Sequence, residues 1–588
     1  PLEEIKNFRQ WGSLTPGHIE YGLTPGVDMT TGPLAQGFAA GVGMAMAERY
    51  LAARFNRPGH EIIDHYTYAI VSDGDMEEGL SSEAASLAGT LRLGKLIYLY
   101  DKNDISIEGD TAITFTEDVA GRFKACGWQV LGPLDGMDID AVAGAISEAQ
   151  AKKDCPSLII CRTHIGYGSP NKQDSAAAHG EPLGEAEARL TKEKLGWDYD
   201  QSFVVPETVR DYFRRARERG EAAQAAWRAV FEKYHTAYPE LAAQLARELG
   251  GELPERWDQA LSGLIPADAE PMATREASGK VLNALAGSVP VLIGGSADLA
   301  PSNKTRLKDG GDFSADNYCG RNLHFGIREH AMAAACNGMA LDGLRPFGAT
   351  FFVFADYCRP SIRLAAMMKL PVLYVFTHDS IAVGEDGPTH QPIEHLAALR
   401  AIPNLIVVRP ADANEVAEAY RTLVPLKDQP ACLVLTRQNL PTIDREKYAS
   451  ATGVAQGGYI LADSEGTPEV ILIGTGSEVA ICLEAREKLA AEGIAARVVS
   501  LPSWELFEAQ PQEYRDSVLP PEVTARVGVE MAIEMGWQKY LGQCSQGKGG
   551  RFLGMNNFGI SGPYQKLLER YGFTADNIAA EAKAAMGR

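Results

Sequence analysis

One stretch of this 588-residue chain, residues 65–107, constrains its fold more than any other. Two apolar runs, at 65–71 and 96–100, are followed by the polar segments Ser72–Asp75 and Asp101–Ile105. Between them, apolar residues recur at helical spacing, at Leu80, Ala84, Leu87, Ala88 and Leu91. The stretch therefore predicts a strand, a crossover helix and a second strand parallel to the first.

Polar side chains follow both predicted strands, Asp73 after the first and Asn103 after the second. Because the crossover is right-handed, both residues are expected at the same carboxyl edge of one sheet, where open α/β sheets bind ligands. A carboxylate and a carboxamide oxygen suit a hard divalent cation such as Mg²⁺, and Gly74 lets the backbone approach a phosphate. Ordinary turn chemistry explains either residue alone, but their joint placement favours a metal and phosphate site.

Length and charge narrow the class of protein. At about 150 residues per domain, the chain predicts three or four units. With 56 basic and 77 acidic residues the formal charge is −21, which argues against a nucleic-acid or anionic-membrane partner. We find no apolar run of 18 residues and no signal peptide, so a soluble, cytoplasmic protein is expected. The nine cysteines lie far apart without a Cys-x-x-Cys pair, which indicates free thiols.

Strand and helix patterns alternate along the chain, which predicts an α/β fold of three consecutive doubly wound domains with mostly parallel sheets. We expect a first domain at 1–196, a charged helical connector at 197–266, a second domain at 267–445 and a third at 446–588. The expected strands after residue 107 are 128–130, 157–161, 289–293, 372–376, 405–408, 431–435, 470–473, 496–501 and 525–529. The turn Gly474–Gly476 is interpreted as a helix start, not a nucleotide loop.

Two further segments carry candidate functional residues. The loop 15–37 is rich in Gly, Pro and Thr and opens into a helix at 38–54, a pattern suited to phosphate although helix packing explains its glycines equally well. In the second domain, Glu329 is expected at a helix start, where it also complements the helix dipole. Aromatic residues three apart, Phe351, Phe354 and Tyr357, favour a core stripe when taken alone.

A cluster of His and Asp in the Gly/Pro loop 378–392 is hard to explain by packing. Together these motifs resemble those of transketolases, which depend on thiamine diphosphate. The resemblance runs from the first ten residues to the last helix, through Thr15–His18, Thr30–Gly37, Ser72–Gly79, Asp101–Ile105, Gly294–Asn303, Gly326–Glu329, Gly384–Pro392 and Thr436–Leu440. It implies the thiamine-diphosphate-binding fold, with diphosphate-binding, pyrimidine-binding and C-terminal domains. It also implies a homodimer whose cofactor lies between the first domain of one subunit and the second of the other.

The resemblance also implies roles for individual residues around the cofactor. Asp73, Asn103 and the carbonyl of Ile105 would bind Mg²⁺ or Ca²⁺. Gly32, Leu34 and Gly74 would line the diphosphate, and Glu329 would contact the aminopyrimidine nitrogen. Phe351, Phe354 and Tyr357 would form the pyrimidine wall. His179 would also bind the cofactor, and Glu78 and Asp298 would lie near it at the subunit boundary.

The substrate residues implied are Arg275, Ser302, His378 and Arg437 for the phosphate, Asp386 for a sugar hydroxyl, and His18, His179 and His390 for the hydroxyls around the reacting carbons. Glu329 and these last three histidines would be catalytic. The implied activity is that of a transferase in the pentose phosphate pathway or the Calvin cycle. A thiamine carbanion would take a two-carbon ketol unit from a ketose phosphate, such as xylulose 5-phosphate, and hold it as an enamine. An aldose phosphate, such as ribose 5-phosphate or erythrose 4-phosphate, would accept it.

Alternatives are dihydroxyacetone synthase and deoxyxylulose-phosphate synthase, which use the same cofactor, or a truncated, non-catalytic dimeric scaffold. The sequence departs from the family pattern in two respects. Ser72 replaces the first glycine of a Gly-Asp-Gly-like motif. Motifs like Ser-Gly-His-Pro-Gly and Gly-His-Gly, which the family carries in an N-terminal segment, do not occur. We therefore expect an N-terminally incomplete first domain that lacks two active-site histidines and binds the cofactor more weakly.

Overall fold

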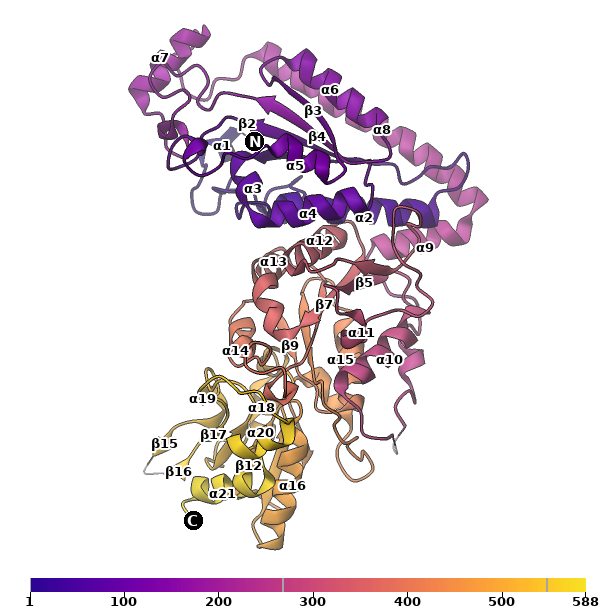
Figure 1. Ribbon diagram of the computed structural model, residues 1–588, viewed down its shortest axis with the longest axis vertical. Coiled ribbons are helices and arrows are strands. Elements are labelled where there is room, and N and C mark those ends of the chain that lie inside the picture. The colour runs from indigo at the N-terminus through magenta and orange to yellow at the C-terminus, as the bar shows by residue number, and fades with distance from the viewer. Residues whose placement is uncertain (1, 267–268, 546–547) are drawn as a thin grey trace. The chain divides into compact units, whose positions relative to one another are not determined.

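The computed structural model describes residues 2–266, 269–545 and 548–588, so the predicted domain boundary at 267 lies outside the described residues. The chain divides into two compact units (Figure 1). The first comprises residues 1–250, 313–320 and 337–343, and the second comprises 251–312, 321–336 and 344–588. Within the described residues no helix is long and apolar enough to cross a membrane.

The first unit contains a four-stranded sheet in the order β1-β2-β4-β3, with every pair parallel. Its strands are β1 (Thr67–Ser72), β2 (Leu96–Lys102), β3 (Gln129–Asp135) and β4 (Ser157–Arg162). Helices α3 (Asp73–Glu77) and α4 (Gly79–Thr90) connect β1 to β2, which confirms the predicted strand–helix–strand unit. Since Ser72 pairs with Asp101, both strands end at the same level, and the residues that follow them are neighbours.

Alternate residues of β2 pack on opposite faces of this sheet, as the pleat requires. Ile97 packs with Ala145 and Ala149 of α6 (Ile139–Ala151). The ring of Tyr98 lies 4.7 Å from that of Phe38 in α2 (Gln36–Phe55). The sheet therefore carries helices on both faces, as predicted for a doubly wound domain. The remaining helices before α8 are α1 (Leu2–Lys6), α5 (Val119–Ala125) and α7 (Glu185–Leu195).

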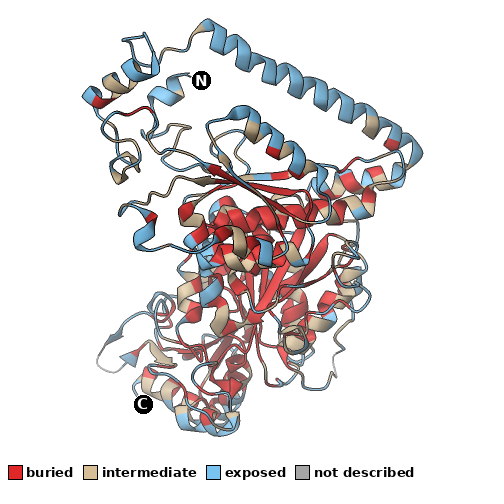
Figure 2. Ribbon diagram, turned by 45° about the horizontal axis from the view of Figure 1, so that its top comes forward, coloured by how far each residue is buried: buried red, intermediate tan, exposed pale blue. Residues whose placement is uncertain are grey.

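Two helices, α8 (Glu207–Ala237) and α9 (Pro239–Leu249), confirm the helical character expected for the charged segment. Among the residues of α8 only Tyr234 is buried, and Figure 2 shows the helix exposed over almost its whole length. Ion pairs along the helix, such as Arg217 with Glu221 at 2.8 Å, lie on this solvated surface. Such interleaved charges are typical of a solvated helix.

The second unit contains a six-stranded parallel sheet in the order β6-β5-β7-β8-β10-β9. Its strands are β5 (Leu292–Ser296), β6 (Asn322–His324), β7 (Arg345–Phe351), β8 (Leu373–Thr377), β9 (Ile406–Val408) and β10 (Ala431–Leu435). The helices are α10 (Thr274–Ala286), α11 (Ala300–Asn303), α12 (Glu329–Leu341), α13 (Ala355–Met368), α14 (His395–Arg400) and α15 (Ala413–Leu423). The strand predicted at 289–293 begins three residues later, because Val289 and Val291 are buried in the connection that precedes it.

A five-stranded sheet in the order β11-β13-β12-β14-β17 follows, parallel except for β11 against β13. Its strands are β11 (Tyr459–Ala462), β12 (Val470–Gly474), β13 (Ala496–Ser500), β14 (Arg526–Val529) and β17 (Arg551–Leu553); β15 (Cys544–Ser545) and β16 (Lys548–Gly549) pair separately. The helices are α16 (Glu478–Ala491), α17 (Trp504–Glu508), α18 (Gln512–Val518), α19 (Gln538–Leu541), α20 (Tyr564–Tyr571) and α21 (Ala575–Met586). Because α16 begins just after Gly474–Gly476, the interpretation of that turn as a helix start is confirmed.

Candidate active site

The predicted metal ligands in the first unit converge at the end of β1 and β2. Asp73 is 3% exposed, and its Oδ2 accepts hydrogen bonds from the backbone N–H groups of Asn103 at 3.2 Å and Asp104 at 3.0 Å. The Oδ1 of Asn103 accepts one from Ile105 N at 3.1 Å. Burial, which disfavours a charged carboxylate, raises the pKa of Asp73 above its ordinary value. The carboxylate of Asp73 and the carboxamide of Asn103 are oxygen donors of the kind that Mg²⁺ or Ca²⁺ prefers.

The loop Gly32–Leu34 lies against the turn that follows β1. A Cβ at Gly74 would lie 2.9 Å from the Cδ1 of Leu34, so the two segments are in close contact. The carboxylate of Asp75 fastens the two segments, since it accepts hydrogen bonds from Ala35 N at 2.7 Å and Ser72 N at 2.8 Å. The 20-residue helix α2 begins at Gln36, directly after this loop, and a helix start reached through a Gly-rich loop fits a diphosphate.

Three further site residues were predicted in the first unit: His18, His179 and Glu78. His18 lies over Gly32, where a Cβ would be 3.0 Å from the imidazole Cδ2. A cavity of about 940 Å³ is lined by His18, the loop 31–34 and strand β1. His179 follows the 3₁₀ turn Ala176–Ala178, and its Nδ1 is buried with no hydrogen-bond partner in the described part of the chain. Glu78 is exposed at the start of α4, and no contact brings it to His18.

In the second unit, Glu329 begins α12 as predicted. It is 8% exposed, and Oε1 accepts a hydrogen bond from Thr350 Oγ1 at 3.3 Å. Nearby, the rings of Phe351 and Phe354 lie 6.1 Å apart, and those of Phe354 and Tyr357 also lie 6.1 Å apart. These three rings are only partly buried, and Tyr357 is 63% exposed, so the interpretation as a core stripe is wrong. The residues share a partly open aromatic face instead, which fits a wall for a flat ring.

The residues predicted to bind the substrate phosphate also converge. The His378 ring lies 3.7 Å from that of Phe351, and its Nε2 is 3.5 Å from Arg275 Nη1. Arg275 Nη1 donates to Ser302 O at 3.0 Å, and Arg437 Nη1 donates to Val383 O at 3.2 Å. Burial, with the charges of Arg275 and Arg437, lowers the pKa of His378 to about 3. This imidazole is thus neutral at pH 7, and the local positive charge comes from the two guanidinium groups.

Three further site residues were predicted in the second unit: His390, Asp386 and Asp298. The His390 ring is 5.6 Å from that of Phe354 and 6.3 Å from that of Phe351, so it faces the aromatic wall. Asp386 is exposed in the same loop. Asp298 is exposed after β5 with a left-handed φ of 62°, and no described contact joins it to His378 or Glu329.

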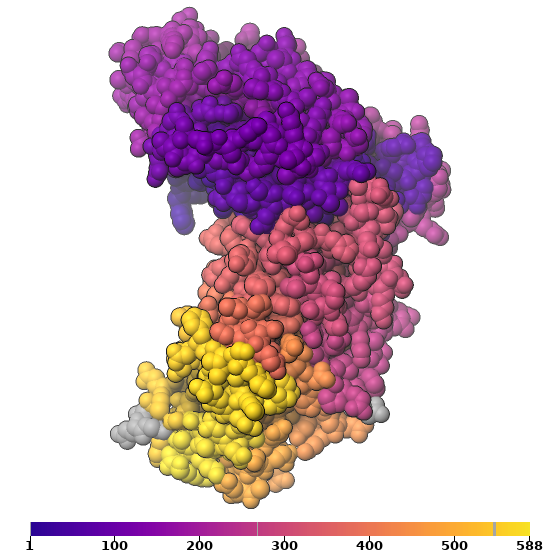
Figure 3. Space-filling model, viewed as in Figure 1, coloured from indigo at the N-terminus to yellow at the C-terminus, as the bar shows by residue number. Residues whose placement is uncertain are grey.

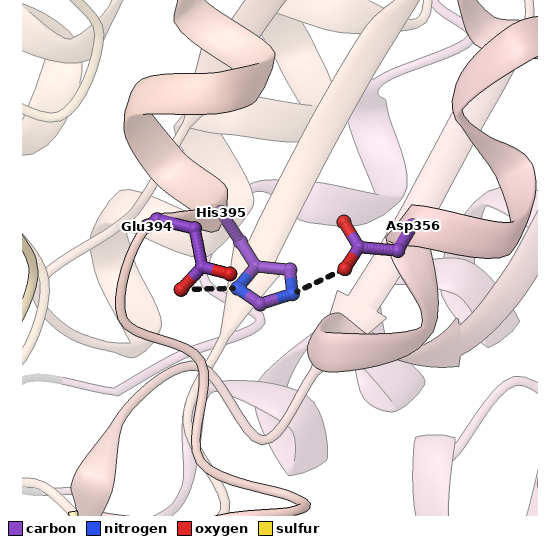
Figure 4. A group of neighbouring side chains, drawn as sticks. All are labelled: Asp356, Glu394 and His395. Carbon is purple, nitrogen blue, oxygen red and sulfur yellow. Dashed lines mark ion pairs between the residues drawn. The ribbon is translucent and has the colours of Figure 1, made fainter. Parts of the chain in front are cut away.

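A group that sequence reasoning missed consists of Asp356, Glu394 and His395 (Figure 4). His395 Nε2 lies 3.3 Å from Asp356 Oδ2 and 3.1 Å from Val353 O, whereas Nδ1 lies 3.8 Å from Glu394 Oε2. The two carboxylates therefore approach opposite nitrogens of one ring. Because a cation takes the lone pair of a single ring nitrogen, this arrangement fits an imidazole held between carboxylates better than a three-ligand metal site.

Comparison with known proteins identifies the family. Residues 1–254 match the family of the transketolase thiamine diphosphate binding domain, residues 270–442 the transketolase pyrimidine binding domain, and residues 457–574 the transketolase-like C-terminal domain. The chain is 55% identical to the transketolase of Geobacillus stearothermophilus over 100% of its own length and 87% of that protein. The chain belongs to the transketolase family.

Further relatives agree. Chloroplastic transketolase of Zea mays is 50% identical over 99% of this chain and 86% of that protein. Among solved structures, Leishmania mexicana transketolase matches with a TM-score of 0.95 and 42% identity, covering 100% of this chain and 86% of that one. A Pichia stipitis transketolase in complex with sedoheptulose 7-phosphate matches with a TM-score of 0.94, 42% identity and the same coverage.

These comparisons confirm three predictions made from the sequence: the fold, the enzyme class and the cofactor. The chain has the fold of a transketolase, with three α/β domains and mostly parallel sheets. It is a transferase of the transketolase type, and its cofactor is thiamine diphosphate with a divalent metal ion. The individual site residues and the predicted domain boundaries stay predictions.

Proposed function

We propose that this member of the transketolase family moves a two-carbon ketol unit between sugar phosphates. The donor is a ketose phosphate such as xylulose 5-phosphate, and the acceptor is an aldose phosphate such as ribose 5-phosphate or erythrose 4-phosphate. The observation that carries the proposal is the convergence of Arg275, Ser302 and His378, with Arg437 close enough to influence the pKa of His378. Guanidinium groups bind phosphate through bidentate hydrogen bonds. The Pichia stipitis relative, solved with sedoheptulose 7-phosphate, agrees with this substrate class.

In this proposal the cofactor is held by the first domain of one subunit and the second domain of its partner. Asp73, Asn103 and the carbonyl of Ile105 hold Mg²⁺ or Ca²⁺, and Gly32, Leu34 and Gly74 receive the diphosphate. Phe351, Phe354 and Tyr357 form the pyrimidine wall, and His179, Glu78 and Asp298 complete the cofactor environment. When bound, thiamine diphosphate supplies the carbon nucleophile.

The protein's own groups then manage protons and orientation. Glu329 holds a proton against the pyrimidine nitrogen, for which its nearly buried position excludes bulk water. His18, His179 and His390 exchange protons with the hydroxyls around the reacting carbons. Asp386 orients a further sugar hydroxyl.

The proposal extends to assembly and context. We infer a cytoplasmic homodimer in which two copies complete each active site, in the pentose phosphate pathway or the Calvin cycle. The support is the resemblance to the family, whose relatives include bacterial and chloroplastic enzymes. The alternatives left open by the sequence were dihydroxyacetone synthase, deoxyxylulose-phosphate synthase and a non-catalytic scaffold, and the family comparisons favour transketolase over all three. Transfer from xylulose 5-phosphate to ribose 5-phosphate, assayed with and without thiamine diphosphate and Mg²⁺, separates all of them from the proposed one.

Replacing Arg275 by Ala tests the phosphate site directly. We expect KM for xylulose 5-phosphate to rise roughly ten- to a hundredfold, because a charge-assisted contact contributes ~1.5–3 kcal/mol. KM for hydroxypyruvate, which carries no phosphate, should change little. Arg306→Ala, at an exposed arginine of the same unit, serves as the control. An equal rise of KM for both donors in the Arg275 variant would assign this arginine a structural role only.

A further inference from the structure

Asp379, which follows His378, is hydrogen-bonded by a residue outside the proposed phosphate site. Asp379 is 2% exposed, and its Oδ2 accepts a hydrogen bond from Arg409 Nε at 2.9 Å. On the other side of His378, Thr377 Oγ1 lies 2.8 Å from the imidazole Nδ1. His378 lies between these two interactions and has a left-handed φ of 66°. A non-glycine residue adopts this conformation only where its surroundings impose it.

Arg409 connects this loop to the C-terminal domain. It follows β9, is 1% exposed, and its Nη1 donates to Thr475 O at 3.0 Å, Thr475 Oγ1 at 3.0 Å and Glu478 Oε1 at 2.9 Å. A Cβ at Gly476 would lie 2.6 Å from the guanidinium carbon, so this glycine lets the C-terminal backbone lie directly on Arg409. In the space-filling view the yellow C-terminal residues lie against the salmon-coloured middle domain of the same unit (Figure 3).

The acceptors of Arg409 are themselves fixed. Glu478 Oε2 accepts a hydrogen bond from Ser477 Oγ at 2.7 Å. Thr475 Oγ1 donates to Glu530 Oε1 at 2.7 Å, and Glu530 binds both terminal nitrogens of Arg400 at 2.8 and 2.9 Å. These residues follow the carboxyl ends of β8, β9, β12 and β14 or lie in the adjoining helices, so two sheets contribute to one buried network. Charge-assisted hydrogen bonds between buried groups strengthen one another in the low-dielectric interior, which favours a single geometry.

We propose that Arg409, Thr475 and Glu478 are positioning residues for substrate phosphate binding, through which the C-terminal domain sets the conformation of His378. They hold Asp379 in place, and Asp379 in turn keeps the imidazole of His378 against the ring of Phe351 and directed at Arg275. The inference rests on the proposed role of His378 and Arg275 in binding phosphate. It gives the C-terminal domain a part in substrate selection without any contact to the substrate.

Glu478→Gln tests this inference, because it removes one of the two carboxylate charges paired with Arg409 and keeps the shape of the side chain. In the full-length protein with thiamine diphosphate and Mg²⁺, KM for xylulose 5-phosphate should rise about tenfold, as expected for one weakened charge-assisted contact. KM and kcat for hydroxypyruvate should stay within about twofold of the unmodified protein. A residue with a merely structural role would not separate the two donors.

Glu415→Gln is the matched control. Glu415 is equally buried and also joins the middle and C-terminal domains, since it accepts hydrogen bonds from Tyr459 Oη and Ser500 Oγ, both at 2.7 Å. Its partners lie on β11 and β13, away from the loop that carries His378. We expect this variant to lower the melting temperature without separating the two donors.

Thr475→Val provides a second, milder variant in case Glu478→Gln does not fold. It removes one acceptor of Arg409 and should produce the same split in KM. If Arg275→Ala shows the split and neither network variant does, the inference is wrong and the proposed phosphate site stands. If Arg275→Ala shows no split, the proposed phosphate site is wrong and the inference falls with it.

Discussion

Glu329→Gln is expected to abolish ketol transfer, with kcat lower by at least ~10²–10⁴-fold, the usual contribution of a positioned acid or base. The amide has nearly the same shape and can still accept the hydrogen bond from Thr350 Oγ1. It cannot give up or take a proton, so it cannot hold one against the pyrimidine nitrogen. The substitution leaves an uncharged side chain of nearly the same shape in the nearly buried first turn of α12, so the fold should persist.

Two measurements check this expectation. Loss of proton exchange at C2 of bound thiamine diphosphate, followed by NMR, reports the proton step, and a melting curve reports the fold. Asp356→Asn is the control, because Asp356 also lies in the first turn of a helix of the same unit, close to the aromatic wall. Exchange at the unmodified rate in Glu329→Gln would remove this residue from the mechanism.

Asp73→Asn should remove the dependence of cofactor binding on metal. The carboxylate is the only charged member of the proposed ligand set, so we expect the Kd of thiamine diphosphate in the presence of Mg²⁺ to rise by about 100-fold, at the upper end of the effects known even for supporting residues around a metal. A ligand at 100 times its Kd stabilises the folded state by about 2.7 kcal/mol. The rise in melting temperature on adding cofactor and Mg²⁺ should therefore largely disappear.

Without metal and cofactor, Asp73→Asn is not expected to destabilise the protein at pH 7. Burial raises the pKa of Asp73 above 3.8, so the protonated carboxyl stabilises the fold below pH 3.8, and this contribution is lost as the pH rises through the raised pKa. Asparagine carries no charge at any pH, so the metal-free variant should be at least as stable as the unmodified protein at pH 7. Melting temperatures between pH 4 and pH 8 measure this difference.

Asp104→Asn is the control for both experiments. It removes a neighbouring carboxylate at a left-handed position, with a φ of 60°, that asparagine tolerates equally well. An unchanged Mg²⁺ dependence in Asp73→Asn would show that the cation binds elsewhere.

Local patterns were sufficient to predict the elements that order the first unit. The apolar runs at 65–71 and 96–100 became β1 and β2, and the parallel crossover placed Asp73 beside Asn103. The start of a helix at Glu329 was also predicted, since a helix start is a local property. Strand β7 was not predicted, because its residues 345–351 are almost all buried and contain Pro346 and Gly348, so no alternation is visible.

Tertiary contacts explain what sequence reasoning missed. Phe351, Phe354 and Tyr357 lie in a strand, a 3₁₀ turn and a helix in turn, so their spacing of three does not describe one buried helix face. Arg409 was not predicted to have a role, because its partners Asp379 and Glu478 lie 30 and 69 residues away in the sequence. Asp75 was not predicted to have a role, although its carboxylate accepts hydrogen bonds from Ser72 N and from Ala35 N, 40 residues away in the sequence.

The buried network around Arg409 means that the C-terminal domain is not a removable module. Cutting the chain between the middle and C-terminal domains would separate Arg409 from Glu478, and Arg400 from Glu530, both in an interior with almost no solvent access. Removing one partner of a buried ion pair costs about 3–5 kcal/mol, and a domain is stable by only about 5–15 kcal/mol. Any exchange of this domain between relatives must therefore carry the acceptors of both arginines with it.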